Sequence, residues 1–401
     1  MESKQNSLQH VKKRHRFWFF IVRPIAYIIG WIYHFKAHVY KLKANNPCLI
    51  LSNHQAALDP IFLALCFNKP IYFVSSDHIF HKGFISKLLV HCFAPIPRKK
   101  GDLDIQFIME MIRVKNQGGN IAIFLEGNRT WTNSQFHIPN SAVKLVKKLN
   151  VDLVLFNLKG GFGVDPRFAK DIRKGKFSGQ VRYHISKEQI NEMSEEELQE
   201  LIVQSLDIKD GSNGELFKSK RRAEYLERMM FVCPYCHQKY TLSSNKELVK
   251  CSSCGGEIEY TENLKLLYKK DNSVHELIDY YRFQLDTVIN DEIKENEIIC
   301  SDDDITLYDQ TNGKRVLISK GHCELNDKLL SFDNISISVN DITAASLIGG
   351  TMLVFNTKDT EYIIIGGDRF NGFKYILYFN RVVPSFKNRV DNYYGLNIFK
   401  H

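Results

Sequence analysis

Residues Ile50–Pro60 read ILSNHQAALDP, and the predicted fold depends on the change from an apolar run to a helix within this stretch. An apolar run ends at Ser52, and Asn53 and His54 follow it. Asp59 stands immediately before the proline. We expect a buried strand, a short loop and a helix that begins at Asp59. Loops at strand ends often carry chemistry on a rigid scaffold, so this stretch is also the first candidate for a functional site.

Short apolar runs alternate with segments of helical spacing on both sides of this stretch. The runs lack polar alternation, which is typical of strands covered on both faces. The predicted strands are CLILS (48–52), IYFVSS (71–76), IAIFLE (121–126) and VDLVLFNL (151–158). The predicted helices are DPIFLALCF (59–67), DIQFIMEMIRVKNQGG (104–119), NSAVKLVKKLN (140–150) and MSEEELQELIVQSL (193–206), the last with a capping box. This pattern predicts an α/β domain over residues 41–215.

The composition of the whole chain limits the classes of protein to consider. Its 401 residues exceed the usual size of one domain and predict two or three. A composition of 44% hydrophobic and 25% charged residues excludes a mainly disordered chain. The net charge of +9 suits anionic partners, which include phospholipid headgroups, phosphorylated substrates and nucleic acid.

Residues 1–40 form a basic segment followed by an apolar one. The basic residues are Lys12, Lys13, Arg14 and Arg16. The apolar stretch FWFFIVRPIAYIIGWIYHF (17–35) is interrupted by Arg23, Pro24 and Gly30. A spanning helix needs about 20 mostly apolar residues, so we expect peripheral or monotopic attachment to the cytoplasmic face of a membrane. A buried core helix is the alternative. A secretory signal is disfavoured, because no convincing small-residue cleavage site follows.

His54 and Asp59 form a candidate catalytic pair. A carboxylate can accept the proton of one imidazole nitrogen and leave the other as a general base near neutral pH. No nucleophilic serine or cysteine stands beside them. Because the chain contains 14 histidines, one such spacing is close to what chance alone gives. The pair therefore needs support from other motifs.

Two further loops place cations and a carboxylate after apolar runs. The candidates are Arg98, Lys99 and Lys100 in FAPIPRKKGD (93–102), and Glu126, Gly127 and Arg129 in IFLEGNRTWT (123–132). Arg can hold a phosphate through two hydrogen bonds of fixed geometry, whereas Lys supplies a point charge. A glycine permits a close backbone approach or a positive φ. Each loop taken singly could be a solvated turn, but together they suit transfer to a phosphate-bearing acceptor.

In this order and at these intervals, the motifs resemble those of the glycerophospholipid acyltransferase family, which includes the lysophosphatidic acid (1-acyl-sn-glycerol-3-phosphate) acyltransferases. The resemblance covers about residues 15–210. It implies acyl transfer from a thioester of coenzyme A or acyl carrier protein to the free hydroxyl of lysophosphatidic acid or a related lysophospholipid, in phospholipid biosynthesis. It also implies work at a membrane surface.

The resemblance implies a role for each site residue. His54 would deprotonate the acceptor hydroxyl, and Asp59 would orient and charge-balance the imidazole, without an acyl-enzyme intermediate. The implied substrate-binding residues are Asn53, Arg98, Glu126, Gly127 and Arg129. The two arginines would hold the acceptor phosphate, while the other residues would shape the site.

The chain also departs from the family pattern. Leu125 and Asn128 stand where the family usually has proline and threonine, and VDLVLFNLKGG contains Asp152 and no proline. These changes leave the base and the arginines in place. A lysine or ornithine lipid, or glycerol 3-phosphate itself, therefore stays open as the acceptor.

Two Cys-x-x-Cys pairs predict a structural zinc ribbon within residues 216–270. The candidate ligands are Cys233, Cys236, Cys251 and Cys254. Two such hairpins can place four thiolates tetrahedrally around Zn²⁺. A disulfide pair or a redox dithiol is the alternative, but a small loop-rich segment lacks the core to fold without metal. The basic stretch SKRRAEYLERMMF (219–231) is predicted to be a connecting helix.

A zinc ribbon in a basic protein also suggests a different class of function. In that alternative, the chain binds nucleic acid or a partner and its acyltransferase-like domain is not catalytic. Lys239, Lys246 and Lys250 supply charge, but Tyr240 is the one exposed-looking aromatic among them. Binding of single strands uses several stacking aromatics along a basic groove, so a structural ribbon is favoured and nucleic acid is disfavoured.

The last part of the chain predicts a helical linker and a β-rich module. The stretch NSVHELIDYYRFQLDTVIN has helical spacing and forms the linker over 271–295. Residues 296–385 contain short runs of period two, followed by a helix over Arg369–Phe379, and 386–401 form a tail. The runs are DITLYD, KRVLIS, KLLSFD, ISISV, TMLVFN and EYIIIG. This order resembles the pleckstrin-homology or GRAM group, which implies a phosphoinositide or protein partner; a purely structural barrel is the alternative.

Overall fold

The chain forms two structural units. It leaves the first unit for the second and returns twice before its last part continues in the second unit. The computed structural model describes residues 11, 13–43, 46–76, 84–98, 105–135, 137–311 and 313–386. The first unit comprises Met1–Thr130, Ser134–Val164 and Lys174–Glu215. The second comprises Trp131–Asn133, Asp165–Arg173 and Leu216–His401. Two short segments of the predicted α/β domain therefore belong to the second unit.

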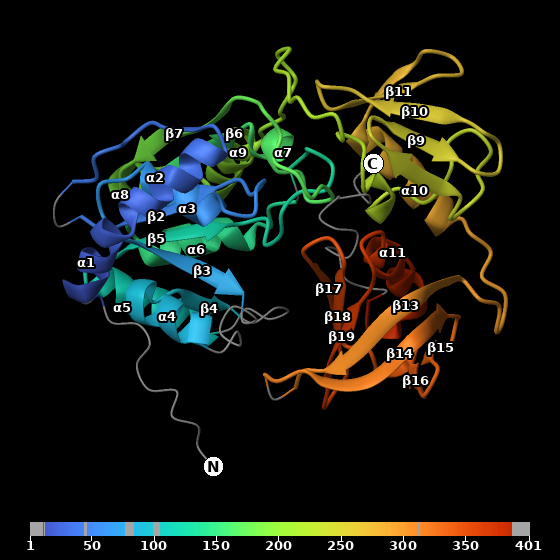
Figure 1. The fold of residues 1–401 in the computed structure, drawn as a ribbon. Coiled ribbons are helices and arrows are strands. Elements are labelled where there is room, and N and C mark those ends of the chain that lie inside the picture. Colours follow the sequence, from blue (N-terminus) through green and yellow to red (C-terminus); the bar gives the residue numbers. More distant parts are fainter. Residues whose placement is uncertain are drawn as a thin grey trace. The chain divides into compact units, whose positions relative to one another are not determined.

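A seven-stranded sheet organises the first unit, with the strand order β1-β7-β6-β2-β5-β3-β4 (Figure 1). The strands are β1 (Phe35–Ala37), β2 (Cys48–Ser52), β3 (Ile71–Ser76), β4 (Ile96–Arg98), β5 (Asn120–Phe124), β6 (Asp152–Lys159) and β7 (Phe177–Ile185). β2 pairs in parallel with β5 and β6, whereas β7 runs antiparallel to β6. All residues of β2 and β5 are buried, which explains their unbroken apolar runs. The predicted α/β architecture of this half is confirmed.

Nine helices are described in this unit, within the ranges given above. They are α1 (Lys13–Ile21), α2 (Arg23–Ile32), α3 (Asp59–Leu65), α4 (Phe84–Phe93), α5 (Ile105–Asn116), α6 (Ser141–Leu149), α7 (Gly161–Val164), α8 (Lys187–Glu192) and α9 (Glu195–Leu206). Alternate residues of the central strands form one core with α5, α6 and α9. The predicted capping box is present, because Ser194 Oγ accepts from Glu197 N and the Glu197 carboxylate accepts from Ser194 N.

The first two helices present large apolar side chains to solvent. These are Phe17, Phe20, Ile21, Ile25, Tyr27, Ile28, Trp31 and Ile32. Trp31 is 79% exposed. Among the described residues, no helix combines the length and the apolarity that crossing a bilayer requires. We call this exposed set the apolar surface of α1 and α2.

Arg23 attaches α2 to α3. Its guanidinium donates to the carbonyls of Leu65 and Phe67, at 2.8 Å each. These carbonyls lie at the C-terminal end of α3, where a helix leaves backbone acceptors without intrahelical partners. Gly30 allows a close approach, since a Cβ there would lie 3.4 Å from Leu65 Cδ1. The apolar surface is therefore fixed directly to the helix that begins with Asp59.

Asp210 anchors the turn after β6 from within the first unit. Its carboxylate accepts the backbone N–H of Gly160 at 2.7 Å and of Gly163 at 3.1 Å. Burial raises the pKa of the Asp210 carboxyl to about 6, against the hydrogen bonds, which lower it. In the unfolded chain the pKa of an aspartate carboxyl is about 3.9. Because the folded protein binds the proton more tightly, protonation of Asp210 raises the free energy of unfolding. This gain is complete below about pH 4 and is lost as the pH rises through 6.

The stability of an Asp210→Asn variant should test this pH dependence. The introduced amide cannot titrate and offers one acceptor fewer, so the variant should be less stable than the wild type. We expect its deficit in free energy of unfolding to grow by about 1 kcal/mol between pH 7 and pH 5. Urea midpoints of both proteins across this range measure the deficit. A deficit that is equal at both pH values would contradict the expectation.

Two antiparallel sheets form the main part of the second unit. The first has the order β12-β11-β10-β9-β8, and the second β16-β15-β14-β13-β19-β18-β17. Their strands are β8 (Leu242–Asn245), β9 (Leu248–Cys251), β10 (Glu257–Tyr260), β11 (Lys265–Tyr268), β12 (Val274–Glu276), β13 (Cys300–Asp309), β14 (Val316–Leu325), β15 (Leu329–Phe332), β16 (Ile335–Ser338), β17 (Ala344–Ile348), β18 (Met352–Asn356) and β19 (Glu361–Ile365). The helices are α10 (Leu277–Ile289) and α11 (Gly372–Val382).

The cysteine-bearing sheet and the C-terminal sheet are joined within this unit. Asp291 accepts hydrogen bonds from Lys239 Nζ at 2.5 Å and from Tyr378 Oη at 2.7 Å. Lys239 follows the first cysteine pair, and Tyr378 lies in α11. The region predicted as a separate ribbon and a separate β-rich module is therefore one structural unit.

Two helix predictions for this region need correction. The predicted connecting helix over 219–231 is wrong, because the segment forms turns and the short 3₁₀ helix η2 (Leu226–Arg228). Tyr225 has a left-handed backbone, with φ of 72°, which interrupts a helix. The predicted helix over 272–290 begins only at Leu277, since β12 pairs with β11. Strand β17 was not predicted.

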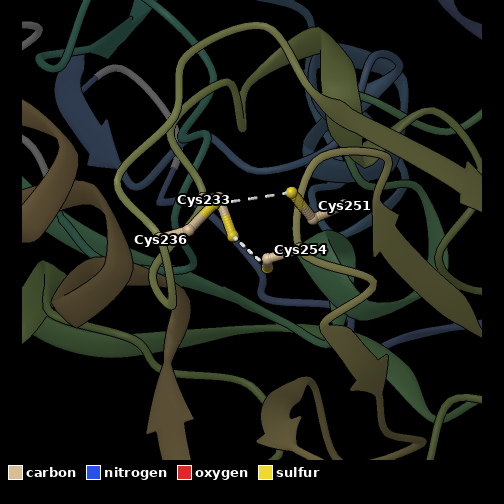
Figure 2. A group of neighbouring side chains, drawn as sticks. All are labelled: Cys233, Cys236, Cys251 and Cys254. Carbon is tan, nitrogen blue, oxygen red and sulfur yellow. Dashed lines mark hydrogen bonds between the residues drawn. The ribbon is translucent and has the colours of Figure 1, made fainter.

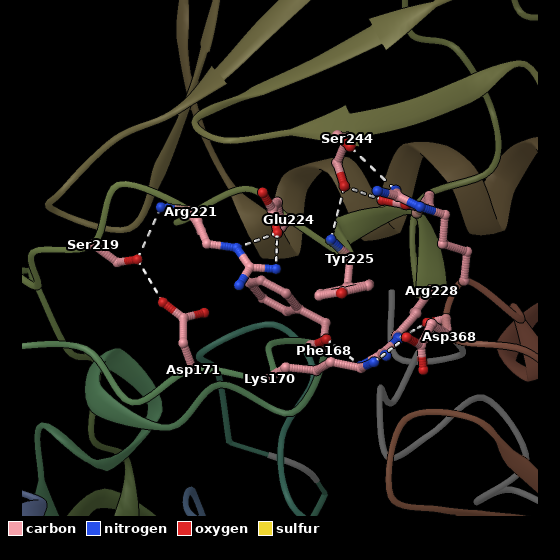
Figure 3. A network of polar contacts seen from close by, with 12 residues as sticks. Phe168, Lys170, Asp171, Ser219, Arg221, Glu224, Tyr225, Arg228, Ser244 and Asp368 are labelled. Carbon is pink, nitrogen blue, oxygen red and sulfur yellow. Dashed lines mark hydrogen bonds and ion pairs between the residues drawn. The ribbon is translucent and has the colours of Figure 1, made fainter.

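The segment Asp165–Arg173 is held in the second unit by a polar network (Figure 3). Arg228 donates to the carbonyl of Phe168 at 2.6 Å and to that of Asp368 at 2.8 Å. Ser219 Oγ donates to Asp171 at 2.6 Å, and Lys170 forms an ion pair with Asp368. These partners lie far apart in the sequence, so the network fastens the inserted segment to its unit.

The other inserted segment, Trp131–Asn133, contributes a core residue. Trp131 is 1% exposed and its ring lies 5.4 Å from that of Phe373 in α11. The guanidinium of Arg167 lies over the indole at 4.6 Å, and Arg167 also donates to the carbonyl of Leu347 at 2.8 Å. Both inserted segments are therefore integral parts of the second unit.

Candidate active site and metal site

His54 and Asp59 meet at the end of β2. His54 Nδ1 lies 2.8 Å from Asp59 Oδ2, and the exposed fractions of the two side chains are 19% and zero. Asp59 Oδ2 also accepts the backbone N–H of Gln55 at 2.7 Å and of Ala56 at 3.0 Å. The carboxylate thus closes the loop between β2 and α3 and fixes the imidazole at the same time.

This contact defines the protonation pattern of the neutral imidazole. An ionised carboxylate is an acceptor only, so Nδ1 carries the proton and donates a hydrogen bond to Asp59. Nε2 is then the unprotonated nitrogen of a ring that is still partly exposed to solvent. The two residues singled out in ILSNHQAALDP are therefore in contact, and the imidazole remains partly exposed.

The loop after β5 forms hydrogen bonds with the backbone of His54. Glu126 Oε1 accepts the backbone N–H of His54 at 2.9 Å, and the N–H of Thr130 donates to the His54 carbonyl at 3.2 Å. Gly127 has φ of 67°, a left-handed conformation that favours glycine. The structure thus brings Glu126 and Gly127 to His54, with Glu126 bound to its backbone.

Phe124 is a neighbour of His54 that the sequence did not single out. The two rings are stacked, with centroids 4.5 Å apart and planes at 25°. Phe124 is the last residue of β5 and stands two positions before Glu126. An aromatic residue at the carboxyl end of the strand beside β2 is the signal that could have found it. It covers one face of the imidazole, whereas Asp59 contacts the ring at Nδ1.

The remaining predicted site residues differ in their placement. Asn53 is 3% exposed; its amide donates to the Leu158 carbonyl at 2.7 Å and accepts the Leu158 N–H at 2.9 Å. These bonds tie the end of β2 to β6. Arg129 is partly buried in the loop after β5. Arg98 ends β4, but its side chain lies outside the described residues, as do Lys99 and Lys100.

The four predicted metal ligands converge in the second unit (Figure 2). Their sulfur atoms all lie within 4.8 Å of one another. Cys233 Sγ is 3.7 Å from Cys254 Sγ, and Cys236 Sγ is 3.8 Å from Cys251 Sγ. A tetrahedron with Zn–S bonds of about 2.3 Å has S–S edges of about 3.8 Å, whereas a disulfide requires about 2.05 Å. The arrangement fits a four-thiolate metal site.

The two Cys-x-x-Cys turns have the same backbone geometry. His237 N donates to the Cys233 carbonyl at 2.9 Å, and Gly255 N donates to the Cys251 carbonyl at 3.0 Å. His237 and Gly255 both have a left-handed φ, of 60° and 68°. This repeated turn directs each pair of sulfur atoms to a common point. The fit to a metal therefore rests on the backbone as well as on the thiolates.

Comparisons with known proteins bear on the first unit. Residues 33–156 match the family model described as Acyltransferase. This range contains both members of the His54–Asp59 pair and the loop after β5. No curated protein sequence matches the chain. Among solved structures, the 1-acyl-sn-glycerophosphate (LPA) acyltransferase PlsC from Thermotoga maritima is similar at 13% identity and a TM-score of 0.40, over 48% of this chain and 78% of that one.

Proposed function

From the acyltransferase domain that residues 33–156 form, we propose that this protein transfers an acyl group from a thioester to the free hydroxyl of a lysophospholipid. Lysophosphatidic acid is the first candidate acceptor. The observation that carries the proposal is the 2.8 Å hydrogen bond from His54 to Asp59, in an imidazole that remains 19% exposed. A buried carboxylate that orients an accessible imidazole supplies a general base.

The reaction proceeds by direct attack of the acceptor on the thioester. His54 Nε2 takes the proton of the hydroxyl as its oxygen bonds to the thioester carbonyl carbon. Asp59 stabilises the imidazolium that forms. The carbon–sulfur bond then breaks, and the imidazolium returns the proton to the leaving thiolate of coenzyme A or acyl carrier protein. His54 ends the cycle neutral.

Recognition of the acceptor falls to two arginines, one at the end of β4 and one in the loop after β5. Arg129 and Arg98 hold the acceptor phosphate, because a guanidinium can donate two parallel hydrogen bonds to it. Asn53, Glu126 and Gly127 shape the site through the backbone contacts described above. A zwitterionic lysine or ornithine lipid, or glycerol 3-phosphate, competes with lysophosphatidic acid as acceptor in this proposal.

The enzyme works at the cytoplasmic face of a membrane as a peripheral or monotopic protein. The apolar surface of α1 and α2 supports this location, because water-exposed Trp and Ile side chains on a short helix suit the headgroup boundary. The contacts of Arg23 tie that surface to the helix that carries Asp59. A lysophospholipid could then reach His54 from the bilayer surface.

Transfer of labelled acyl groups by the purified wild-type protein tests the proposal. Acyl-coenzyme A and acyl-acyl carrier protein are each offered with lysophosphatidic acid, glycerol 3-phosphate or a lyso-ornithine lipid. We expect labelled phosphatidic acid from at least one of the two donors. If the protein transfers the label to none of these acceptors, the proposed function is wrong.

The second unit has a supporting role in this proposal. Four cysteine thiolates suit Zn²⁺, and a site whose four positions are all filled by protein is structural. The seven-stranded sheet with α11 is proposed to be a pleckstrin-homology-like module, for which its strand number and terminal helix are the support. Its partner would be a phosphoinositide headgroup or another protein.

A further inference from the structure

A basic hollow opens at the edge of the first unit, outside the His54 site. It has a volume of about 570 Å³. Its polar lining consists of His34, Lys36, His38, Lys174, Lys176 and Ser178. Among the described residues that line it, none is Asp or Glu. We refer to this feature as the basic hollow.

The pairing of two strands builds this hollow. Edge strand β1 pairs in parallel with the start of β7, and Lys36 stands opposite Ser178. Phe35 turns toward the core, where its ring lies 4.8 Å from those of Phe62 and Phe177. Because side chains alternate along a strand, His34, Lys36 and His38 turn the other way and are exposed.

The opposite wall of the basic hollow is also held in place. A Cβ at Gly160 would lie 1.9 Å from the Lys176 carbonyl, so this glycine lets the end of β6 touch the segment that carries Lys176. Lys174 and Lys176 are both exposed and stand two residues apart. Three lysines thus line one hollow, and their charges suit the oxygen atoms of a phosphate.

The position of the basic hollow distinguishes a lipid from a soluble ligand. His34 follows Ile32, the last residue of α2, by two positions, or about 7 Å of chain. The hollow therefore begins where the apolar surface of α1 and α2 ends. In a bilayer, phosphates lie directly above the acyl region, so a protein with its apolar surface inserted would present these cations at headgroup depth.

The acyl acceptor itself cannot fill the basic hollow. Gly179 of β7 stands opposite Leu158, to which Asn53 is bound, so the hollow and His54 lie at the same end of the sheet. The hollow is lined by β1 and β7, which the order β1-β7-β6-β2 places three and two strand spacings from β2, or about 10–14 Å. The phosphate of lysophosphatidic acid is only a few bonds from its free hydroxyl. It therefore cannot reach the hollow while that hydroxyl contacts His54.

We propose that the basic hollow binds the phosphate of an anionic phospholipid that is not the acyl acceptor. Its occupant would hold the first unit on membranes of negative surface charge. This site goes beyond the proposed transfer reaction, because it would act whether or not acyl transfer occurs.

Vesicle binding by the full-length protein tests this site. The probes are vesicles of phosphatidylcholine alone and of phosphatidylcholine mixed with phosphatidylglycerol. The variant Lys36→Gln/Lys176→Gln removes two lining charges, and Lys144→Gln/Lys148→Gln removes two exposed charges of α6 as a matched control. We expect the first variant to bind the anionic vesicles about tenfold more weakly or worse, and the control to bind nearly as the wild type.

Two outcomes would overturn the proposal. Equal losses in both variants would show a general effect of charge. The second is an effect of inorganic phosphate or coenzyme A that raises the unfolding temperature of the wild type but not of the Lys36/Lys176 variant, while both proteins bind vesicles equally well. This outcome would assign the hollow to a soluble phosphate.

Acyl transfer to a short-chain lysophosphatidic acid without vesicles is measured in parallel. A wild type that transfers nothing but still prefers anionic vesicles would refute the proposed function alone.

Discussion

The His54→Ala variant is expected to lose about 10²–10⁴-fold in kcat/KM for acyl transfer, because it lacks the base that takes the hydroxyl proton. The fold should persist, since Asp59 keeps its two backbone donors from Gln55 and Ala56. Rates with labelled donor and the circular dichroism spectrum of the same preparation measure the two effects. A His91→Ala variant is the matched control, because that histidine is exposed on α4.

The size of the loss is informative by itself. His54 is assigned as the base if kcat/KM falls within this range while the secondary structure is unchanged and the His91 control keeps the wild-type kcat/KM. A His54→Ala protein that retains the wild-type rate would mean that another group deprotonates the acceptor, and the mechanism proposed above would have to be abandoned.

The Cys251→Ser variant is expected to lose its metal and the folded state of the cysteine-bearing sheet. Structural zinc sites of this kind contribute about 10–16 kcal/mol of apparent binding free energy, which is coupled to folding. Removal of one thiolate should therefore lower the zinc content from about one per chain to nearly none. Elemental analysis and the temperature of thermal unfolding measure the two losses.

Ser253→Ala is the control for this substitution. Ser253 lies in the same turn, is exposed and supplies no ligand. We expect it to keep both zinc and the unfolding temperature. If Cys251→Ser unfolds at the wild-type temperature and binds as much zinc, the four cysteines do not form a structural metal site.

Local patterns were sufficient to predict the elements whose residues interact with near neighbours in the sequence. The buried strand β2 follows from its unbroken apolar run, and the start of α3 at Asp59 follows from the residues on either side of it. The hydrogen bond between His54 and Asp59 spans only five positions, and their spacing together with the other motifs in the chain made the pair a candidate. The cysteine cluster likewise depends on two short turns.

Contacts between distant residues could not be predicted in this way. The helix predicted over 219–231 is replaced by turns in which Tyr225 has a left-handed backbone, and Arg228 of the same segment bonds the Phe168 carbonyl, sixty positions earlier. Phe124 meets His54 only because β5 pairs with β2. The interruption at Arg23 gave no sign that this residue binds the end of α3. Such pairs depend on how segments far apart in the sequence pack together, which the local apolar pattern of each segment does not specify.

The interleaving of the two units has a consequence for biosynthesis. Trp131 is made long before Phe373, the α11 residue against which its indole packs. At about 5–20 residues per second, the ribosome needs roughly 10–50 s to reach that partner. During this interval the nascent first unit carries an indole and the arginine-bearing segment 165–173 without the core that receives them. The second unit can therefore close around Trp131 and segment 165–173 only after its C-terminal half has been synthesised.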